Sequence, residues 1–205
     1  MMEVARPKVL FLRPGKEDEI YEVLRRSKAV WGTGISLDDY VEYHSLIRNH
    51  KWSQRNFQHL VLIDESCQIF SSCKVYHHQV RIDSEQFRLA AIGAIFTPNE
   101  NRRLGYASQM LEHLLDQLSE QGFDLALLFS DIGTEFYARL GFRLFSKKDP
   151  VFSFSERGIA PADIQVLNHL PKEAMEWDQC VDQGQRFALL KSLDYFQLLS
   201  ERIFW

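Results

Sequence analysis

The sequence predicts a mixed α/β (α+β) fold, in which a mostly antiparallel central sheet is flanked by helices and followed by a C-terminal helical extension. Two observations indicate this fold. Three segments rich in Val, Ile, Phe and Tyr, at 59–63, 68–80 and 86–97, follow one another with only short polar breaks, which is typical of consecutive antiparallel strands. Directly after them, apolar residues recur at helical spacing over 107–118, which indicates an amphipathic helix packed on the sheet.

The N-terminal fifty residues predict one strand and two helices. Residues 8–12 have the composition of a short strand that ends at Pro14-Gly15. The acidic residues at 17–19 suit a helix N-terminus, where the helix dipole favours negative charge. Ser36, with Asp39 three residues later, resembles a capping box, so a second helix should run from there to about residue 49. The expected buried residues are Ile20, Val23 and Leu24 in the first helix and Tyr40, Val41, His44 and Ile47 in the second.

The segment after Gly122, which should end the amphipathic helix, predicts two more strands around a short helix. Residues 125–129 are continuously apolar, as expected for a strand covered on both faces. Residues 133–140 predict a short helix that ends at a glycine, and 142–145 predict a further strand.

The polar stretch at 146–150 is the best candidate for a domain boundary. We therefore expect one domain over 1–148 and a C-terminal extension, or part of a second domain, over 149–205. This extension contains a short strand pattern at 151–154 and helical patterns around 172–182 and 185–202.

Composition and charge argue against several classes of function. The formal net charge is −4, from 24 basic and 28 acidic side chains, so no overall field attracts nucleic acid or an anionic membrane surface. No apolar run approaches the length of a membrane span, and the run at 9–12 is too short for a signal peptide. The three cysteines include no Cys-x-x-Cys pair, so we expect a cytoplasmic protein without a disulfide framework or a bound metal.

The loop that joins the last of the three strands to the amphipathic helix has the features of an anion site. The amide groups of a first helical turn point outward unpaired, and the helix dipole adds positive potential there. Gly105 leaves room for the close approach of a ligand, and Arg102 and Arg103 carry charge that suits phosphate oxygens. The pattern favours phosphate binding by main-chain groups, although a tight turn with two solvated arginines would look similar.

This loop and a second segment resemble the GNAT superfamily of N-acetyltransferases. Arg102-Arg103-Leu104-Gly105-Tyr106-Ala107 matches that family's Arg/Gln-x-x-Gly-x-Gly/Ala signature, and residues 135–142 are similar to its Phe-Tyr-x-x-x-Gly-Phe segment. The resemblance covers residues 8–147. Within it, the residues of the motifs are most similar to those of fungal lysine N6-acetyltransferases. It implies a mixed sheet that is splayed open after its fourth strand, with acetyl-CoA lodged in the opening as the acyl donor.

The resemblance also implies which residues bind acetyl-CoA. Backbone groups of Ile95, Phe96 and Thr97 would pair with the pantetheine arm as if it were an added strand. The residues expected around the pyrophosphate are Arg102, Arg103, Leu104, Gly105, Tyr106, Ala107 and Ser108.

The implied reaction is direct attack of a primary amine on the thioester in a ternary complex. Tyr137 matches the tyrosine with which the family protonates the leaving thiolate. At pH 7, removing a proton from an amine with a pKa of about 10.4 costs roughly 4.6 kcal/mol, so a base or a water path is required. The strand at 86–97 lacks the glutamate that many relatives carry. The base candidates are therefore Asp131, one of His77 and His78, which point to opposite faces of a strand, and ordered water.

The expected acceptor is a small-molecule amine such as lysine or a polyamine-like compound. We expect no nucleic-acid or membrane partner, and the sequence leaves a homodimer open. Two alternatives also stay open: acetylation of a protein N-terminus or lysine side chain, and a cofactor-binding regulatory module that has lost catalysis.

Overall fold

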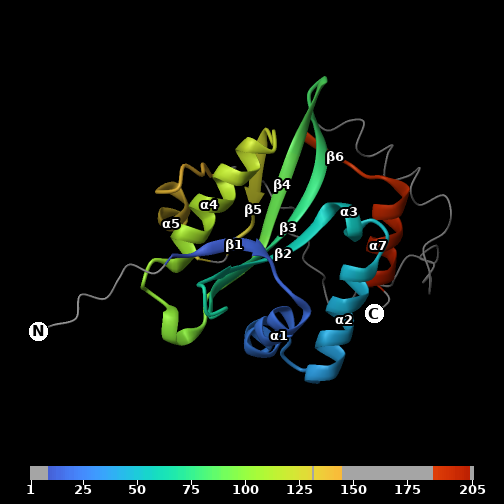
Figure 1. The fold of residues 1–205 in the computed structure, drawn as a ribbon. Helices are drawn as coiled ribbons and strands as arrows, with labels where there is room; N and C mark the ends of the chain where they lie inside the picture. The colour runs from blue at the N-terminus through green and yellow to red at the C-terminus, as the bar shows by residue number, and fades with distance from the viewer. Residues whose placement is uncertain (1–8, 131, 145–186, 204–205) are drawn as a thin grey trace, which may run out of the picture.

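The computed structural model describes residues 9–130, 132–144 and 187–203. Its centre is a sheet whose strands lie in the order β1 (Phe11–Pro14), β2 (Phe57–Ile63), β3 (Ile69–Ile82), β4 (Glu85–Phe96) and β5 (Leu125–Leu128). Neighbouring strands in this order are antiparallel, except that β4 and β5 are parallel. The sheet is therefore mixed and mostly antiparallel, which confirms the predicted fold class (Figure 1).

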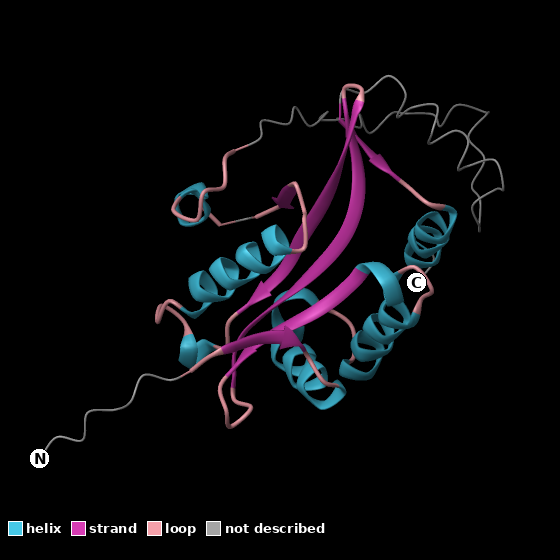
Figure 2. Cartoon of the chain, turned by 45° about the horizontal axis from the view of Figure 1, so that its top comes forward, coloured by secondary structure: helices cyan, strands magenta, loops and turns pink. Residues whose placement is uncertain are grey.

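Helices cover both faces of the sheet (Figures 1 and 2). On one face, α4 (Tyr106–Glu120) buries Met110, Leu111 and Leu114 against side chains from β1 to β4. On the other face lie α1 (Glu17–Trp31), α2 (Leu37–Asn49) and α7 (Leu193–Ile203). The remaining helices are short: α3 (Ser53–Asn56), the 3-10 helix η1 (Asn99–Asn101) and α5 (Thr134–Ala138).

Polar side chains fix the starts of α1 and α2. The Lys16 N–H donates to Glu19 Oε2 at 2.7 Å, and the Arg13 guanidinium donates to both oxygens of the same carboxylate at 2.8 and 2.6 Å. The hydrogen bonds from Arg13 lower the pKa of Glu19. Glu19 therefore stays negatively charged in the first turn of α1, where the helix dipole favours negative charge. At α2, Ser36 Oγ accepts the Asp39 N–H at 3.0 Å, which confirms the predicted cap.

The sheet opens at the C-terminal end of β4. The last pair that joins β4 to β5 is Ile92 with Leu128, whereas β4 continues to Phe96. Among the described residues, β4 therefore has no strand partner on that side over its last four positions. The register between β3 and β4 also shifts here, and Ala94 has a φ of 48°, which marks a β-bulge. Because a bulge bends its strand and increases the local twist, it turns the end of β4 away from the line of β5.

Two predictions around β5 were wrong in detail. The residues of β5 are only half-buried, and Phe129 directly after it is 84% exposed, so the strand is not covered on both faces. No strand forms over 142–144, and Phe145 lies outside the described residues. Instead of continuing the sheet, Phe142 places its ring 6.0 Å from that of Tyr137 in α5. An apolar run indicates burial somewhere, but it does not specify whether the partner is a strand or a helix.

The C-terminal residues add a strand to the sheet where the sequence predicted a helix. Residues 187–190 form β6, which pairs with Gln79–Ile82 of β3 beyond the point where β2 stops. Phe187, Leu190 and Leu193 lie three apart, which suggested a helix, but the edge of β3 beyond β2 supplies hydrogen-bond partners for an extended chain. α7 follows and confirms the helical part of the prediction. The patterns at 151–154 and 172–182 lie outside the described residues.

α7 docks on the domain through Leu198. This side chain is 1% exposed and packs in a cluster with Ile47 of α2 and Trp52. The Lys51 ammonium also lies 3.3 Å from a carboxylate oxygen of Asp194. The C-terminal segment thus contacts the face of the sheet that α2 covers.

We predict that Leu198→Ala lowers the free energy of unfolding by about 2–4 kcal/mol, because it leaves a cavity in this cluster. Leu193→Ala, in the same helix but 57% exposed in the wild type, is the matched control and should cost less than about 0.5 kcal/mol. Urea unfolding measures both. Equal stability of the two variants would show that α7 is not part of the cooperative core.

Candidate functional site

The loop between β4 and α4 has a backbone conformation that few residues adopt. Arg103 and Gly105 both have positive φ, at 62° and 86°, and Gly105 is the N-cap of α4. The left-handed conformation is easy for glycine and costs a residue with a side chain about 1 kcal/mol or more. Such a conformation is retained where the chain must present its main-chain groups in one direction.

The amides after Gly105 are not used by the helix itself. The first hydrogen bond of α4 runs from the Gln109 N–H to Gly105 O, at 3.0 Å. In the described part of the chain, the amides of Tyr106, Ala107 and Ser108 have no acceptor, as expected for a first helical turn. These three donors point along the helix axis, where the dipole adds positive potential. This arrangement can bind a phosphate group.

The space in front of these amides is open. A Cβ atom built on Gly105 meets no heavy atom within 4 Å, so the loop does not close over itself. The Tyr106 ring packs 4.7 Å from the ring of Phe70, so its half-buried side chain does not cover the amides. Arg103 and Leu104 are exposed, and Leu104 keeps 60% of its surface accessible.

The Arg102 side chain, which was expected only to contact phosphate, also makes a hydrogen bond within the protein. Its Nε donates to Thr97 O at 3.1 Å, which ties the loop to the end of β4. Arg102 is nevertheless an exposed residue. Arg102 can therefore hold the loop and still offer a charge to an anion nearby.

The unpaired end of β4 carries the predicted residues Ile95, Phe96 and Thr97. Phe96 packs against Val23 of α1, and its carbonyl accepts a hydrogen bond from Ser71 Oγ at 3.0 Å. One lone pair of that carbonyl is thus already used. After Ile92, the edge of β4 on the β5 side has no strand partner in the described chain, and its main-chain groups could pair with an extended ligand, as exposed strand edges do.

Tyr137 is 8% exposed and lies in α5, which follows β5. It packs on the same apolar cluster as Ile92 and Met110. Ser130 Oγ lies 3.4 Å from the Tyr137 hydroxyl, so the phenol has a polar neighbour just past the end of β5. The second catalytic candidate, Asp131, lies outside the described residues.

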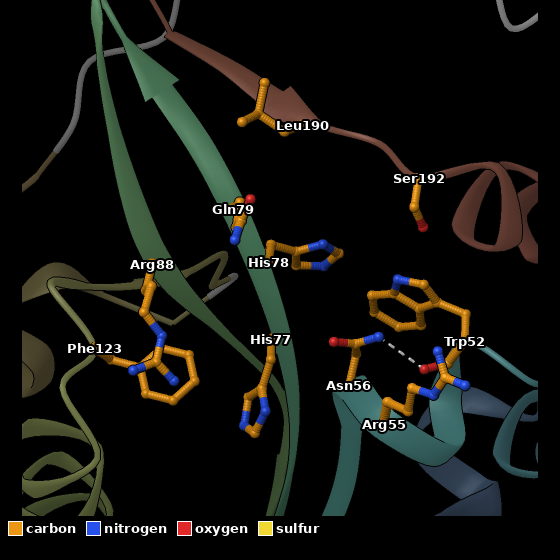
Figure 3. A pocket seen from close by; sticks show the side chains of 10 residues that line it. All are labelled: Trp52, Arg55, Asn56, His77, His78, Gln79, Arg88, Phe123, Leu190 and Ser192. Carbon is orange, nitrogen blue, oxygen red and sulfur yellow. Dashed lines mark hydrogen bonds between the residues drawn. The ribbon is translucent and has the colours of Figure 1, made fainter.

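A cavity of about 360 Å³ lies at a gap along the edge of β3 (Figure 3). β2 pairs with β3 as far as Tyr76 and β6 pairs from Gln79, so within the described chain His77 and His78 have no strand partner on that edge. Their rings point apart, as the alternation of a strand predicts. His77 lies 4.7 Å from the ring of Phe123, and His78 stacks 5.1 Å from that of Trp52.

Neither histidine lies at the open end of β4. They pair with Ala90 and Leu89, where β4 is still joined to β5. Burial lowers the pKa of His77, and it lowers that of His78 to about 4, so both rings are neutral near pH 7. A neutral imidazole could accept a proton, so it is the position of the two rings, away from the open end of β4, that argues against either histidine as the base.

A polar cluster on the face covered by α2 was not found from the sequence. His59 of β2 and Lys74 of β3 are cross-strand partners and are 6% and 7% exposed. The Lys74 ammonium lies 3.1 Å from Nδ1 of His44 in α2. In the sequence, His59 and Lys74 are only two of several polar residues in the predicted strands, and their contact depends on the strand register.

The matching family is the acetyltransferase (GNAT) domain, which covers residues 12–145. The chain belongs to the GNAT acetyltransferase family. The resemblance to this family that the sequence showed is thereby confirmed. A lysine acetyltransferase of Yarrowia lipolytica is 25% identical over 149 residues. That match covers 60% of this chain, which spans only 38% of the relative's length.

Solved acetyltransferase structures share the fold. An acetyltransferase of Trypanosoma brucei superposes with a TM-score of 0.53 at 16% identity, over 71% of this chain and 100% of that one. A GNAT family N-acetyltransferase of Escherichia coli, in complex with CoA, superposes with a TM-score of 0.51 at 17% identity, over 69% of this chain and 73% of that one.

The described part of this GNAT protein shows neither a metal-ligand cluster nor a membrane-spanning helix. Within it, no three His, Cys, Asp or Glu side chains come together in a way that could hold a metal ion. Over the same residues, no helix combines the length and apolar character needed to cross a bilayer.

We predict that Gly105→Glu weakens acetyl-CoA binding at least about 100-fold, because its carboxylate would stand in front of the Tyr106–Ser108 amides. Gly105→Ala is the matched control: it adds the same strain at positive φ without the charge, and should weaken binding less than about 10-fold. Isothermal titration calorimetry measures both affinities. Wild-type affinity in the Glu variant would contradict the assignment of the loop.

Proposed function

We propose that this GNAT protein transfers the acetyl group of acetyl-CoA to the primary amine of a small molecule, such as lysine, by direct attack in a ternary complex. The observation that carries the proposal is that two main-chain features lie next to each other: the amides without an acceptor at the start of α4, and the edge of β4 that lacks a strand partner after Ile92. The catalytic domain would comprise residues 1–148, with 149–205 as an extension that contributes β6 and α7.

Acetyl-CoA would lie across this junction. The amides of Tyr106, Ala107 and Ser108 would bind the pyrophosphate, with Arg102, Arg103, Leu104 and Gly105 around it. The pantetheine arm would run along Ile95, Phe96 and Thr97 and bring the thioester into the gap beside β5. Main-chain N–H groups at this end of β4 would then stabilise the charge that develops on the thioester oxygen.

Tyr137 would act as the general acid. As the amine nitrogen bonds to the carbonyl carbon, the carbon–sulfur bond breaks and the sulfur needs a proton. The phenol donates that proton and regains one from the amide nitrogen that has just formed, directly or through water. Ser130 would hold the phenol in place, since its Oγ lies 3.4 Å from the Tyr137 hydroxyl.

The position of α1 and α2 supports a small acceptor. Both helices cover the face of the sheet opposite α4 (Figure 2). If the acceptor reaches the open end of β4 from that face, the two helices would leave more room for a small molecule than for a protein. The Yarrowia lipolytica relative, a lysine acetyltransferase, favours lysine as the acceptor amine. Free lysine, a polyamine and a lysine-containing peptide are therefore the acceptors to compare.

We expect CoA release from acetyl-CoA to depend on an added small amine. The test uses a thiol reagent with L-lysine, spermidine or a lysine-containing peptide, followed by mass spectrometry of the products. Faster release with the peptide than with the free amines would favour protein acetylation. Tight acetyl-CoA binding without release on any amine would instead indicate a regulatory module.

We predict that Tyr137→Phe lowers kcat by about 100-fold and changes the dissociation constant of acetyl-CoA by less than about twofold, because only the departing sulfur needs the phenol. Tyr21→Phe, on the exposed side of α1, is the control and should leave both values unchanged. Stopped-flow and calorimetry separate the two quantities. Full turnover in Tyr137→Phe would remove this residue from the mechanism.

A further inference from the structure

Two side chains join the start of β3 to the segment between β4 and α4. The last pair between β3 and β4 is Ser72 with Phe96, so Ser71 and Ile69 lie beyond the point where the two strands pair. Past that point, side chains make the connection. Ser71 Oγ donates to Phe96 O at 3.0 Å, and Asn101 Nδ2 donates to Ile69 O at 3.2 Å.

Ser71 holds the last residue of β4. Its side chain is 0% exposed, and its Oγ also lies 3.1 Å from Thr97 Oγ1. After Ile92, β4 has no strand partner on its β5 side within the described chain, so its end is held from the β3 side. Buried hydrogen bonds of this kind make a segment rigid. Ser71 therefore fixes where the end of β4 lies relative to the gap beside β5.

Asn101 holds the start of the loop in front of α4. It is the last residue of η1 and is only 7% exposed, although asparagines are mostly exposed in proteins. Its N–H donates to Pro98 O at 2.8 Å, so both its main chain and its side chain are bonded within the protein. The next residue, Arg102, is bonded to Thr97 O through its Nε at 3.1 Å. The loop is thus anchored before it reaches Gly105.

This anchor supports a backbone conformation that is unfavourable by itself. Arg103 has a φ of 62°, which a residue with a side chain adopts at a cost. Such conformations persist only where the surrounding structure holds them. Asn101 holds one end of the loop, and α4, which buries Met110 completely, holds the other. If the Asn101 anchor were lost, the loop could relax and would have to be ordered again when a ligand binds.

We propose that Ser71 and Asn101 are positioning residues for acetyl-CoA, each for a different half of the molecule. This proposal rests on the function proposed above, in which the pantetheine arm runs along the end of β4 and the diphosphate lies at the start of α4. Ser71 acts on the pantetheine half through Phe96 and Thr97. Asn101 acts on the diphosphate half through the loop at 102–105. Neither side chain has to touch acetyl-CoA, because each acts through the main chain that it holds.

The test measures by NMR titration how tightly two fragments of the cofactor bind. ADP carries a diphosphate and no pantetheine, whereas S-acetylpantetheine carries the pantetheine arm and the thioester but no diphosphate. Asn101→Leu should weaken ADP binding by about 10-fold and S-acetylpantetheine binding by less than about twofold, because it removes one hydrogen bond that holds the loop. Ser71→Ala should have the opposite preference.

Further variants separate the hydrogen bonds from side-chain volume. Asn101→Ala and Asn101→Leu both lack the donor but differ in size, so they should weaken ADP binding equally. Thr97→Val should weaken S-acetylpantetheine binding in the wild type and have no added effect in Ser71→Ala, since the two side chains share one contact. Asn99→Ala, in the same 3-10 helix but exposed, is the matched control and should bind both fragments like the wild type.

Circular dichroism should show that the variants are folded, and the pattern of losses then decides the proposal. Equal weakening of both fragments by Ser71→Ala or by Asn101→Leu would mean that the side chain only supports the fold, and would overturn its positioning role. Unchanged affinity for both fragments would overturn it as well. If the wild type does not bind acetyl-CoA in calorimetry, the proposed function fails. If it does and the variants show no preference, only the positioning roles fail.

Discussion

The structure depends on one constraint: within the described chain, β4 has no strand partner on its β5 side after Ile92, and the first amides of α4 have no acceptor. Such groups are costly to leave unsatisfied when they are buried, so a fold keeps them at a surface that water or a ligand can reach. Here β5 ends at Leu128, the bulge at Ala94 turns β4 aside, and Gly105 begins the helix in a left-handed conformation. Each feature keeps the same set of amides and carbonyls free.

The rest of the molecule holds this opening in a fixed shape. α4 buries Met110 and Leu111 completely against the sheet, which anchors the helix whose first turn presents the amides. On the other face, Phe96 packs against Val23, so the end of β4 is held by α1 even though it lacks a strand partner on one side. A rigid scaffold around free main-chain groups is a preorganised site, because little has to be ordered when a ligand binds.

The sequence predicted the features that depend on residues close together in the chain. The cap at Ser36, the stripe through Met110 and Leu114, and the glycine before α4 all act within one or two turns of chain. The family motif at residues 102–107 also predicted which loop would be the candidate anion site, and that loop has the backbone conformation described above. By contrast, the parallel partnership of β5, the strand at 187–190 and the cross-strand pair of His59 and Lys74 depend on pairing between distant segments. No local periodicity encodes that pairing, and a buried lysine reads as an ordinary solvated residue until its neighbours are known.

The central claim is that the Tyr106, Ala107 and Ser108 amides bind a diphosphate, and nitrogen-15 NMR tests it most directly. On titration with CoA, these three amide resonances should shift downfield and more than those of any residue after Met110, because each N–H gains a charged acceptor. Binding of CoA that leaves these three resonances in place would contradict the account.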